Sequence, residues 1–334
     1  MGISIASVTL AYKFDTQLPK QLEALRLQVR ALDEMIVVNN GANDQTSAML
    51  AARHPNVTAL NLSVNQGAGG GYAAGMAYAA LKKKHDWVWL LDQDSVPAAD
   101  ALEQLLAPLQ RMENLKDKIG LIAPVLTHSG TGLSYSGMRW ANKWVRMDSA
   151  ATNEPVHFAD AVISSGSLIR REVIEQVGLP RADFFIDFVD FEYCLRIRSQ
   201  GFIIAVVSAS HLEHSIGNPQ RKSLLGFSYA WGGHEPWREY YKARNEIFTL
   251  NLYFPGWHGK LSVFSRVLRH ALGILLFGSN KLQCFKMIVR GLRDGSRGQL
   301  GVRFLPDCGK TRLQAVDSRP ATVAPVERIE VKNL

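Results

Sequence analysis

Short, nearly continuous apolar runs alternate with helix-forming stretches over the first 125 residues, and this alternation restricts the fold more than any other feature. The apolar runs, rich in Val, Ile and Leu, span residues 3–10, 35–40, 56–62, 87–91 and 119–124. The helix-forming stretches between them span residues 17–31, 44–53, 69–84 and 98–112. Strands that are apolar on both faces are typical of parallel sheets covered by helices on both sides. The sequence therefore predicts an α/β fold with a mostly parallel sheet, whose ligand site lies beyond the carboxyl ends of the strands.

The rest of the chain changes character. Residues 126–160 are rich in Gly, Ser, Tyr and Trp, which predicts a hairpin or lid. The later expected elements are a close backbone approach followed by a helix within 164–178, a helix over 188–201, a strand over 203–207, a helix over 235–253 and one or two helices over 258–293. We expect an α/β domain over 1–215, a basic helical region over 216–305 and a flexible tail over 306–334.

Two acids follow the fourth apolar run in WVWLLDQDSVP, residues 87–97. Carboxylates as close as those of Asp92 and Asp94 repel each other unless a cation lies between them. They are either solvated as an acidic cap at a strand end, or ligands of a hard divalent ion such as Mg²⁺ or Mn²⁺. Ser95 and Pro97 are expected to begin the next helix.

A glycine-rich stretch, NQGAGGGYAAG at residues 65–75, follows the third apolar run and opens a helix. Glycines let backbone N–H groups approach a ligand, and a helix N-terminus favours an anion. The stretch lacks the Gly-Lys-Ser/Thr of a phosphate-binding P-loop. Close packing of the helix on the sheet would explain the same glycines.

Three acids lie close together in FFIDFVDFEYCLR, residues 184–196. Asp187 precedes the expected helix, whereas Asp190 and Glu192 lie within it. A carboxylate among aromatic side chains suits a general base. Alternatively, these acids pair with Arg196 and Arg198, as acids near arginines on a helix commonly do.

Two histidines follow the last expected strand in HLEHSIGNP. A neutral imidazole of His211 or His214 would be able to complete a metal site begun by the two aspartates. Each histidine, taken alone, is equally well explained by a structural role.

The positive charge is concentrated near the C-terminus. Residues 260–303 hold one acid, Asp294, and nine cations: Lys260, Arg266, Arg269, Lys281, Lys286, Arg290, Arg293, Arg297 and Arg303. This excess equals the formal net charge of +8 of the whole chain. Leucines recur there at helical spacing, at Leu268, Leu272, Leu275 and Leu276. The segment is either a helix lying on an anionic bilayer or a packed helical hairpin with a solvated basic face.

Taken together, these motifs resemble glycosyltransferase family 2. The likeness rests on the strand-terminal DQD, the N-x-G-x-x-G-G loop, DFVDFEYCLR from residue 187, HSIG from residue 214 and REYYKARN from residue 238. Within the family, the chain is most similar to bacterial rhamnosyltransferases that build surface polysaccharides such as O-antigen. The resemblance implies a GT-A fold, a nucleotide-sugar donor, Mg²⁺ or Mn²⁺, and inversion at the anomeric carbon.

The resemblance also implies roles for individual residues. Asp92, Asp94 and His214 would hold the metal, Asp190 would be the catalytic base, and Glu192 and Asp187 would support it. Residues expected to contact the nucleotide sugar are Tyr12, Asn39, Asn65, Gly67, Gly70, Gly71 and Gln93. Arg244 and Asn245 would lie near the diphosphate or acceptor, with helix packing and capping as the alternative.

One departure from the family pattern affects the base. Asn39 stands where the family commonly has an aspartate that faces the pyrimidine ring, in VNNGAND. An amide offers both a donor and an acceptor to a pyrimidine edge, so base binding is retained but its preference is open.

We therefore expect an inverting transferase that moves L-rhamnose from dTDP-L-rhamnose to a glycan or lipid-linked glycan. A galactofuranosyl- or other hexosyltransferase using a UDP-sugar is the alternative within the class. Two alternatives lie outside the class of active glycosyltransferases: a catalytically silent carbohydrate-binding relative and a basic nucleic-acid-binding protein. The basic segment has no recognisable motif for nucleic-acid recognition, so we expect no nucleic-acid partner. Three cysteines without metal spacing and no visible secretory signal favour the cytoplasm, at the inner face of the plasma membrane.

Overall fold

A computed structural model describes residues 2–13, 16–112, 114–128, 132–148, 154–214, 220–224, 227–231, 235–278 and 280–306. The chain forms two compact units. The first comprises Met1–Ala182 and Val189–Asn218, and the second comprises Asp183–Phe188 and Pro219–Leu334. The domain boundary expected between residues 215 and 216 lies outside the described residues, as does the tail expected after Pro306.

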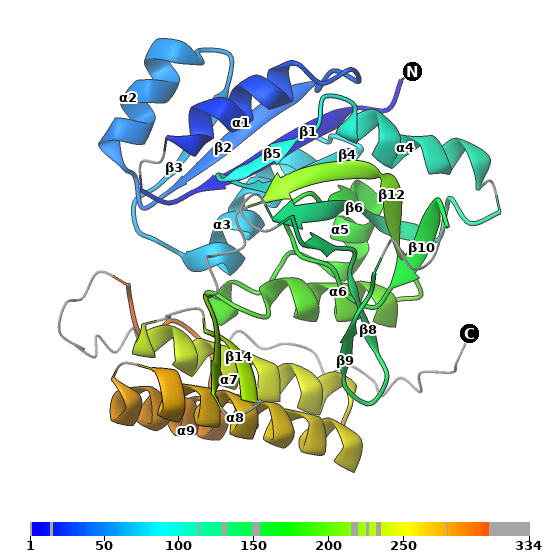
Figure 1. The fold of residues 1–334 in the computed structure, drawn as a ribbon. Helices are drawn as coiled ribbons and strands as arrows, with labels where there is room; N and C mark the ends of the chain where they lie inside the picture. The colour runs from blue at the N-terminus through cyan, green and yellow to red at the C-terminus, as the bar shows by residue number, and fades with distance from the viewer. Residues whose placement is uncertain are drawn as a thin grey trace. The chain divides into compact units, whose positions relative to one another are not determined.

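The first unit is built on a mostly parallel sheet with the strand order β10-β12-β6-β11-β4-β1-β2-β3 (Figure 1). Its parallel strands are β1 (Ile5–Ala11), β2 (Glu34–Asn40), β3 (Thr58–Leu62), β4 (Trp87–Asp92), β6 (Ile119–His128) and β12 (Ile203–His214). The near-continuous apolar sequences of β1, β2, β4 and β6 are mostly buried on both faces, as parallel strands require, whereas every residue of the edge strand β3 is partly or fully exposed. The predicted α/β class and mostly parallel sheet are confirmed.

Short antiparallel strands complete this sheet. β11 (Leu168–Arg170) lies between β4 and β6, β10 (Val156–Ala159) pairs with β12, and β7 (Ser134–Tyr135) pairs with β6. The expected hairpin within 126–160 is present as β8 (Met138–Trp140) and β9 (Trp144–Arg146). Residues 129–131 and 149–153 of that region are outside the described chain.

Two expectations at the site edge are wrong. Ser95 and Pro97 do not begin a helix, because Ser95–Pro97 forms β5, which pairs antiparallel with Leu212–His214. The last strand does not end at residue 207, because β12 resumes pairing with β6 from His211 after a register shift. The two errors have one cause, since the extended end of β12 supplies the partner that keeps β5 in strand conformation.

Helices cover both faces of the sheet. α1 (Gln17–Arg26), α2 (Asp44–Arg53) and α4 (Ala101–Arg111) pack on one face. α3 (Gly67–Met76), the following π-helical turn (Ala77–Lys82), α5 (Arg171–Val177) and α6 (Val189–Ser199) pack on the other. Successive residues of β1 divide accordingly: Ile5 belongs to the first core, whereas Ala6 and Val8 belong to the second. The sheet therefore lies between two helical layers.

The second unit contains α7 (Pro236–Tyr253), α8 (Trp257–Phe277) and α9 (Lys281–Ser296), with the hairpin β13 (Gln220–Leu224) and β14 (Phe227–Trp231). A 3-10 turn spans Ala182–Phe184. α9 approaches α7 closely, since a Cβ atom at Gly295 would lie 2.2 Å from the Arg244 carbonyl oxygen. Among the described helices, none is long and apolar enough to cross a membrane.

Candidate active site

The turn after β4 is fixed by side chains from neighbouring elements. Gln21, fully buried on α1, donates hydrogen bonds to the carbonyl oxygens of Asp92 and Ser95, the second at 2.8 Å. Gln93 Oε1 accepts from the Tyr12 backbone N–H at 2.9 Å, and Gln93 Nε2 donates to the Tyr12 carbonyl oxygen at 3.3 Å. These contacts hold the backbone of the turn so that the side chains of Asp92 and Asp94 project beyond the end of the strand.

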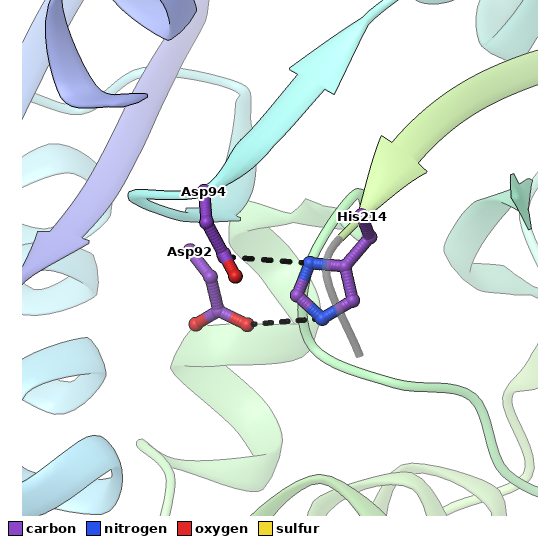
Figure 2. Close-up of side chains that lie close together, drawn as sticks. All are labelled: Asp92, Asp94 and His214. Carbon is purple, nitrogen blue, oxygen red and sulfur yellow. Dashed lines mark ion pairs between the residues drawn. The ribbon is translucent and has the colours of Figure 1, made fainter. Parts of the chain in front are cut away.

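Asp92, Asp94 and His214 come together at this edge (Figure 2). One ligand atom from each lies within 4.8 Å of the others. His214 Nε2 is 3.8 Å from Asp92 Oδ2, and Nδ1 is 3.5 Å from Asp94 Oδ1. His211 is exposed and outside this group, because Leu212 and His214 are the buried residues of the alternating end of β12.

The donor set fits a hard divalent cation. The buried imidazole of His214 is oriented by Ser95, whose Oγ lies 2.7 Å from Nδ1 and 2.7 Å from Ser165 Oγ. Ser165 Oγ also accepts from the Asp92 backbone N–H at 3.0 Å. With Nδ1–H donating to Ser95, Nε2 keeps its lone pair for a cation, as in histidine ligands oriented by a hydrogen-bond partner. Two carboxylates and one imidazole leave coordination positions for diphosphate oxygens.

Tyr72 is a site residue that the sequence did not reveal. Its hydroxyl donates to Asp92 Oδ1 at 2.6 Å from the first turns of α3. Burial, followed by the negative charges of Asp92, Asp94 and Asp190, raises the pKa of Tyr72 well above its usual range. The hydroxyl therefore stays protonated and acts as a donor. The available signal was its place, directly after the glycine run on a helix that begins at the ligand edge.

Asp190 lies in the first turn of α6, where its Oδ1 accepts from the Phe191 backbone N–H at 2.9 Å. It borders a small, mostly apolar pocket lined by residues that include Val162, Val189 and Tyr193. Its negative charge also contributes, after those of Asp92 and Asp94, to the raised pKa of Tyr72. This environment suits the general base that the sequence predicted, and that role stays a prediction.

Glu192 instead follows the alternative of arginine pairing. It is 1% exposed and accepts from Arg196 Nε at 3.1 Å and from Nη2 at 3.0 Å. Arg196 also donates to the carbonyl oxygens of Val177 and Leu179, which ties α6 to the end of α5. Arg198 pairs with Asp160 at 2.5 Å rather than with the acids of its own helix.

The glycine-rich loop is held by two asparagines. Asn65 Oδ1 accepts from the Gly67 N–H at 2.8 Å, and Asn40 Oδ1 accepts from the Gln66 N–H at 2.8 Å. A Cβ atom at Gly71 would lie 2.3 Å from Leu10 Cδ1, and one at Gly70 would lie 2.6 Å from Gln66 Cβ. Close packing thus accounts for Gly70 and Gly71, and contact of this loop with a nucleotide sugar stays a prediction.

Asn39 is fully buried and already hydrogen-bonded within the fold. Its Nδ2 donates to Asn43 O at 3.0 Å, Ser47 Oγ at 3.0 Å and Asn61 Oδ1 at 2.9 Å. Its Oδ1 accepts from the Asn43 N–H at 3.0 Å. These bonds hold the turn into α2, so the expected contact with a pyrimidine base is a prediction without further support from this geometry.

In the second unit, Arg244 and Asn245 bind the backbone of the segment Asp183–Phe188. Fully buried Arg244 donates to the carbonyl oxygens of Asp183 at 2.9 Å, Phe184 at 3.0 Å and Gly301 at 2.6 Å. Asn245 Nδ2 lies within 3.0 Å of the carbonyl oxygens of Phe184, Ile186 and Asp187. These contacts are those of the packing alternative, and an approach to the diphosphate or acceptor stays a prediction.

The segment that they hold is conformationally strained. Phe185, Asp187 and Phe188 have φ angles of 64°, 60° and 62°, in the left-handed region that residues with side chains disfavour. Asp187 is further bound by Arg238, whose Nε and Nη2 donate to its carboxylate at 2.9 and 3.1 Å. These contacts keep Asp187 in an ion pair with Arg238, and its supporting role at the site stays a prediction.

Known proteins resemble this chain over most of its length. Residues 8–178 match the family described as Glycosyl transferase family 2. A dTDP-rhamnosyl transferase, RfbF, of Shigella flexneri is 27% identical over 306 residues, covering 90% of this chain and 98% of the relative. The galactofuranosyltransferase GlfT1 of Mycobacterium tuberculosis is 27% identical over 260 residues, covering 75% of this chain and 83% of the relative.

Solved structures share the fold at low sequence identity. GalNAc-T7, crystallised with UDP, GalNAc and Mn²⁺, matches with a TM-score of 0.58 at 14% identity; the match covers 88% of this chain and 56% of that protein. The 1–349 fragment of Staphylococcus aureus TarS matches with a TM-score of 0.54 at 14% identity, covering 89% of this chain and 83% of the fragment. These matches establish a GT-A glycosyltransferase fold, as the motifs implied.

Tyr72→Phe should weaken cation binding without unfolding the protein. The change removes the hydroxyl that donates to Asp92 and leaves the buried ring in place. Loss of a hydrogen bond to a metal ligand typically lowers affinity about 10- to 100-fold. Calorimetric titration of the full chain with Mn²⁺ measures the affinity for the cation directly. Tyr78→Phe, on the following helical turn, is the control, and equal affinities for wild type and Tyr72→Phe would contradict the role of Tyr72.

Asn245→Ala should destabilise the second unit. The substitution removes the side-chain donor of the Ile186 and Asp187 carbonyl oxygens, whereas the Phe184 carbonyl oxygen keeps its bond from Arg244. A buried polar group without a partner costs about 1–3 kcal/mol. We expect a decrease of that size in the free energy of unfolding, measured by urea titration. Asn251→Ala on the same helix is the matched control. An unchanged free energy for Asn245→Ala would show that the segment holds its strained conformation unaided.

Proposed function

Because the chain belongs to glycosyltransferase family 2, we propose that it transfers L-rhamnose from dTDP-L-rhamnose to a glycan or lipid-linked glycan, with inversion at the anomeric carbon. The chain is a glycosyltransferase of the GT-A fold. The proposal adds the donor, the acceptor class and the roles of the site residues to that statement.

The choice of dTDP-L-rhamnose as the donor rests on how much of the chain aligns with each relative. The dTDP-rhamnosyl transferase of Shigella flexneri aligns over 98% of its own length and 90% of this chain, so the alignment must extend into the second unit. GlfT1 has the same identity of 27% but aligns over 75% of this chain rather than 90%. Galactofuranosyl transfer from a UDP-sugar is therefore the second candidate, and the match to GlfT1 supports it over a smaller part of this chain.

The leaving nucleoside diphosphate would lie at the edge formed by Asp92, Asp94 and His214. Mg²⁺ or Mn²⁺ held there would supply Lewis-acid stabilisation of the charge that collects on the diphosphate as the glycosidic bond breaks. Asp92 and Asp94 are suited to this task because their carboxylates lie together, and Asp92 is held by Gln21 at its backbone and by Tyr72 at its carboxylate. His214 would complete the site through Nε2, since Ser95 engages Nδ1.

Asp190 is the proposed general base. In a single in-line displacement, the acceptor oxygen forms the new bond to the anomeric carbon while the bond to the diphosphate breaks, and the acceptor proton must pass to a base. Asp190 is half-buried in the first turn of α6 and borders a pocket with mostly apolar lining. Glu192 contributes through Arg196, which fixes the helix that carries the base.

We further propose that the reaction serves surface-polysaccharide synthesis at the inner face of the plasma membrane. The acceptor would then be a growing glycan carried on a lipid pyrophosphate. The support is the similarity to the rhamnosyl transferase together with the basic, amphipathic helices of the second unit.

Slow donor hydrolysis tests the donor and the metal together. The full chain is incubated with dTDP-L-rhamnose, UDP-galactofuranose, UDP-glucose or GDP-mannose, with Mg²⁺, Mn²⁺ or EDTA, and the released nucleoside diphosphate is measured alongside donor binding. We expect release and tight binding with dTDP-L-rhamnose, both lost in EDTA. Selective use of UDP-galactofuranose would overturn the donor, and equal binding in EDTA would overturn the metal.

Asp190→Asn should separate chemistry from binding. The amide cannot accept the acceptor proton, so transfer should fall by roughly 10²- to 10⁴-fold. Binding of dTDP-L-rhamnose, measured by calorimetry, should change by less than about threefold, because Asp190 is not proposed as a ligand of the diphosphate. Glu103→Gln, an exposed acid on α4, is the control. Near wild-type transfer by Asp190→Asn would assign the base elsewhere.

A further inference from the structure

α8 exposes an apolar stripe to solvent in addition to the face that it packs inward. The α8 stripe is 40% to 66% exposed at each of its residues, Trp257, Leu261, Phe264, Leu268, Leu272 and Leu275. Their spacing of three and four residues places them along one side of the helix. The four leucines that the sequence placed either on a bilayer or in a packed helical hairpin are thus exposed: Leu268, Leu272, Leu275 and Leu276.

The stripe is not needed for packing of the second unit. The inward side of α8 contributes Ile274 and Val267 to a cluster with Ala243 of α7 and Cys284 and Ile288 of α9. α9 repeats the arrangement on a smaller scale, with Leu282, Phe285 and Val289 between 50% and 79% exposed. Large apolar side chains gathered on one side of a helix and left in water indicate a binding surface.

The charges beside the α8 stripe indicate which kind of partner covers it. α8 contains no acid, and the acid of α9, Asp294, is buried and bound by Tyr240, Arg290 and Arg293. Lys260, Arg269, Lys281 and Lys286 are exposed, and within the described chain none of them forms an ion pair. A partner that covers the stripe must therefore bring negative charge to its flanks.

A second copy of the chain does not meet that demand. A symmetric dimer through the stripe would place the cations of one copy against the same cations of the other, with no exposed acid of α8 or α9 to pair with them. An anionic bilayer supplies phosphate groups at the flanks and hydrocarbon beneath the stripe. Trp257 at the start of α8 is suited to the headgroup region, where one end of the ring is apolar and the other is wet.

We infer that α8, supported by α9, lies in the plane of an anionic membrane surface with the α8 stripe in the lipid interface. The helix of 21 residues is about 30 Å long and rests on the surface rather than spanning the bilayer. The inference rests on the proposed location of the enzyme at the membrane and specifies the surface that binds lipid. Because it concerns lipid binding alone, its failure would leave the proposed sugar transfer untouched.

Vesicle co-sedimentation of the full chain tests it without turnover. Vesicles of neutral phosphatidylcholine are compared with vesicles that also contain 30% phosphatidylglycerol, at low and high salt. Each Lys or Arg near an anionic surface strengthens binding about fivefold. We expect Lys281→Glu/Lys286→Glu to reduce binding to the anionic vesicles at least about 25-fold, and Phe264→Ser/Leu268→Ser to reduce it at least about tenfold.

The controls are Lys20→Glu/Lys82→Glu for charge and Leu27→Ser/Val64→Ser for exposed apolar area, all in the first unit. These four changes should leave vesicle binding within about twofold of wild type. The inference is overturned if wild type does not bind the anionic vesicles, or if the α8 stripe variant binds them as wild type does. A wild-type dimer in sedimentation velocity that Phe264→Ser/Leu268→Ser converts to monomer, without vesicle binding, would assign the stripe to self-association instead.

Discussion

Two carboxylates at one strand end repel each other, and the ligand edge of the first unit is arranged around that repulsion. Gln21 fixes the turn that carries Asp92 and Asp94, Tyr72 donates to Asp92, and Ser95 orients His214 toward both. All three supporting groups act from buried positions, so the arrangement is set by the fold. A divalent cation would neutralise the remaining negative charge, which is why the donor set and the proposed diphosphate ligand belong together.

This constraint also explains the local topology. The chain leaves β4 at Asp92, makes the turn and returns as β5 against the end of β12. β12 must therefore continue to His214, and its alternation places Leu212 and His214 inward. Ser165, which precedes β11, reaches the same hydrogen-bond chain from between β4 and β6. Segments distant in sequence thus converge on one pair of acids.

The sequence was sufficient where the signal was local. Apolar runs predicted the parallel strands, and the family resemblance selected Asp92, Asp94 and His214, whose side chains lie together in the structure. The sequence was insufficient where contacts between distant segments determine the structure. Ser95–Pro97 is a strand because β12 pairs with it, and Tyr72 becomes a site residue because its hydroxyl donates to Asp92. Asn39 stands where the family commonly has an aspartate, and Arg244 matches the family's Arg-Asn pair. The polar atoms of these two residues are nevertheless engaged by Asn61 and by the carbonyl oxygens of Asp183 and Phe184. Motif spacing alone carries no information about such contacts.

The central claim is that Asp92, Asp94 and His214 hold a divalent cation against a nucleoside diphosphate. Crystals of the full chain grown with Mn²⁺ and dTDP, measured at the manganese absorption edge, test it most directly. We predict an anomalous peak within about 2.5 Å of carboxylate oxygens of Asp92 or Asp94 and of His214 Nε2, in contact with the diphosphate. Bound dTDP with no peak at this position, or with manganese held by other residues, would contradict the claim.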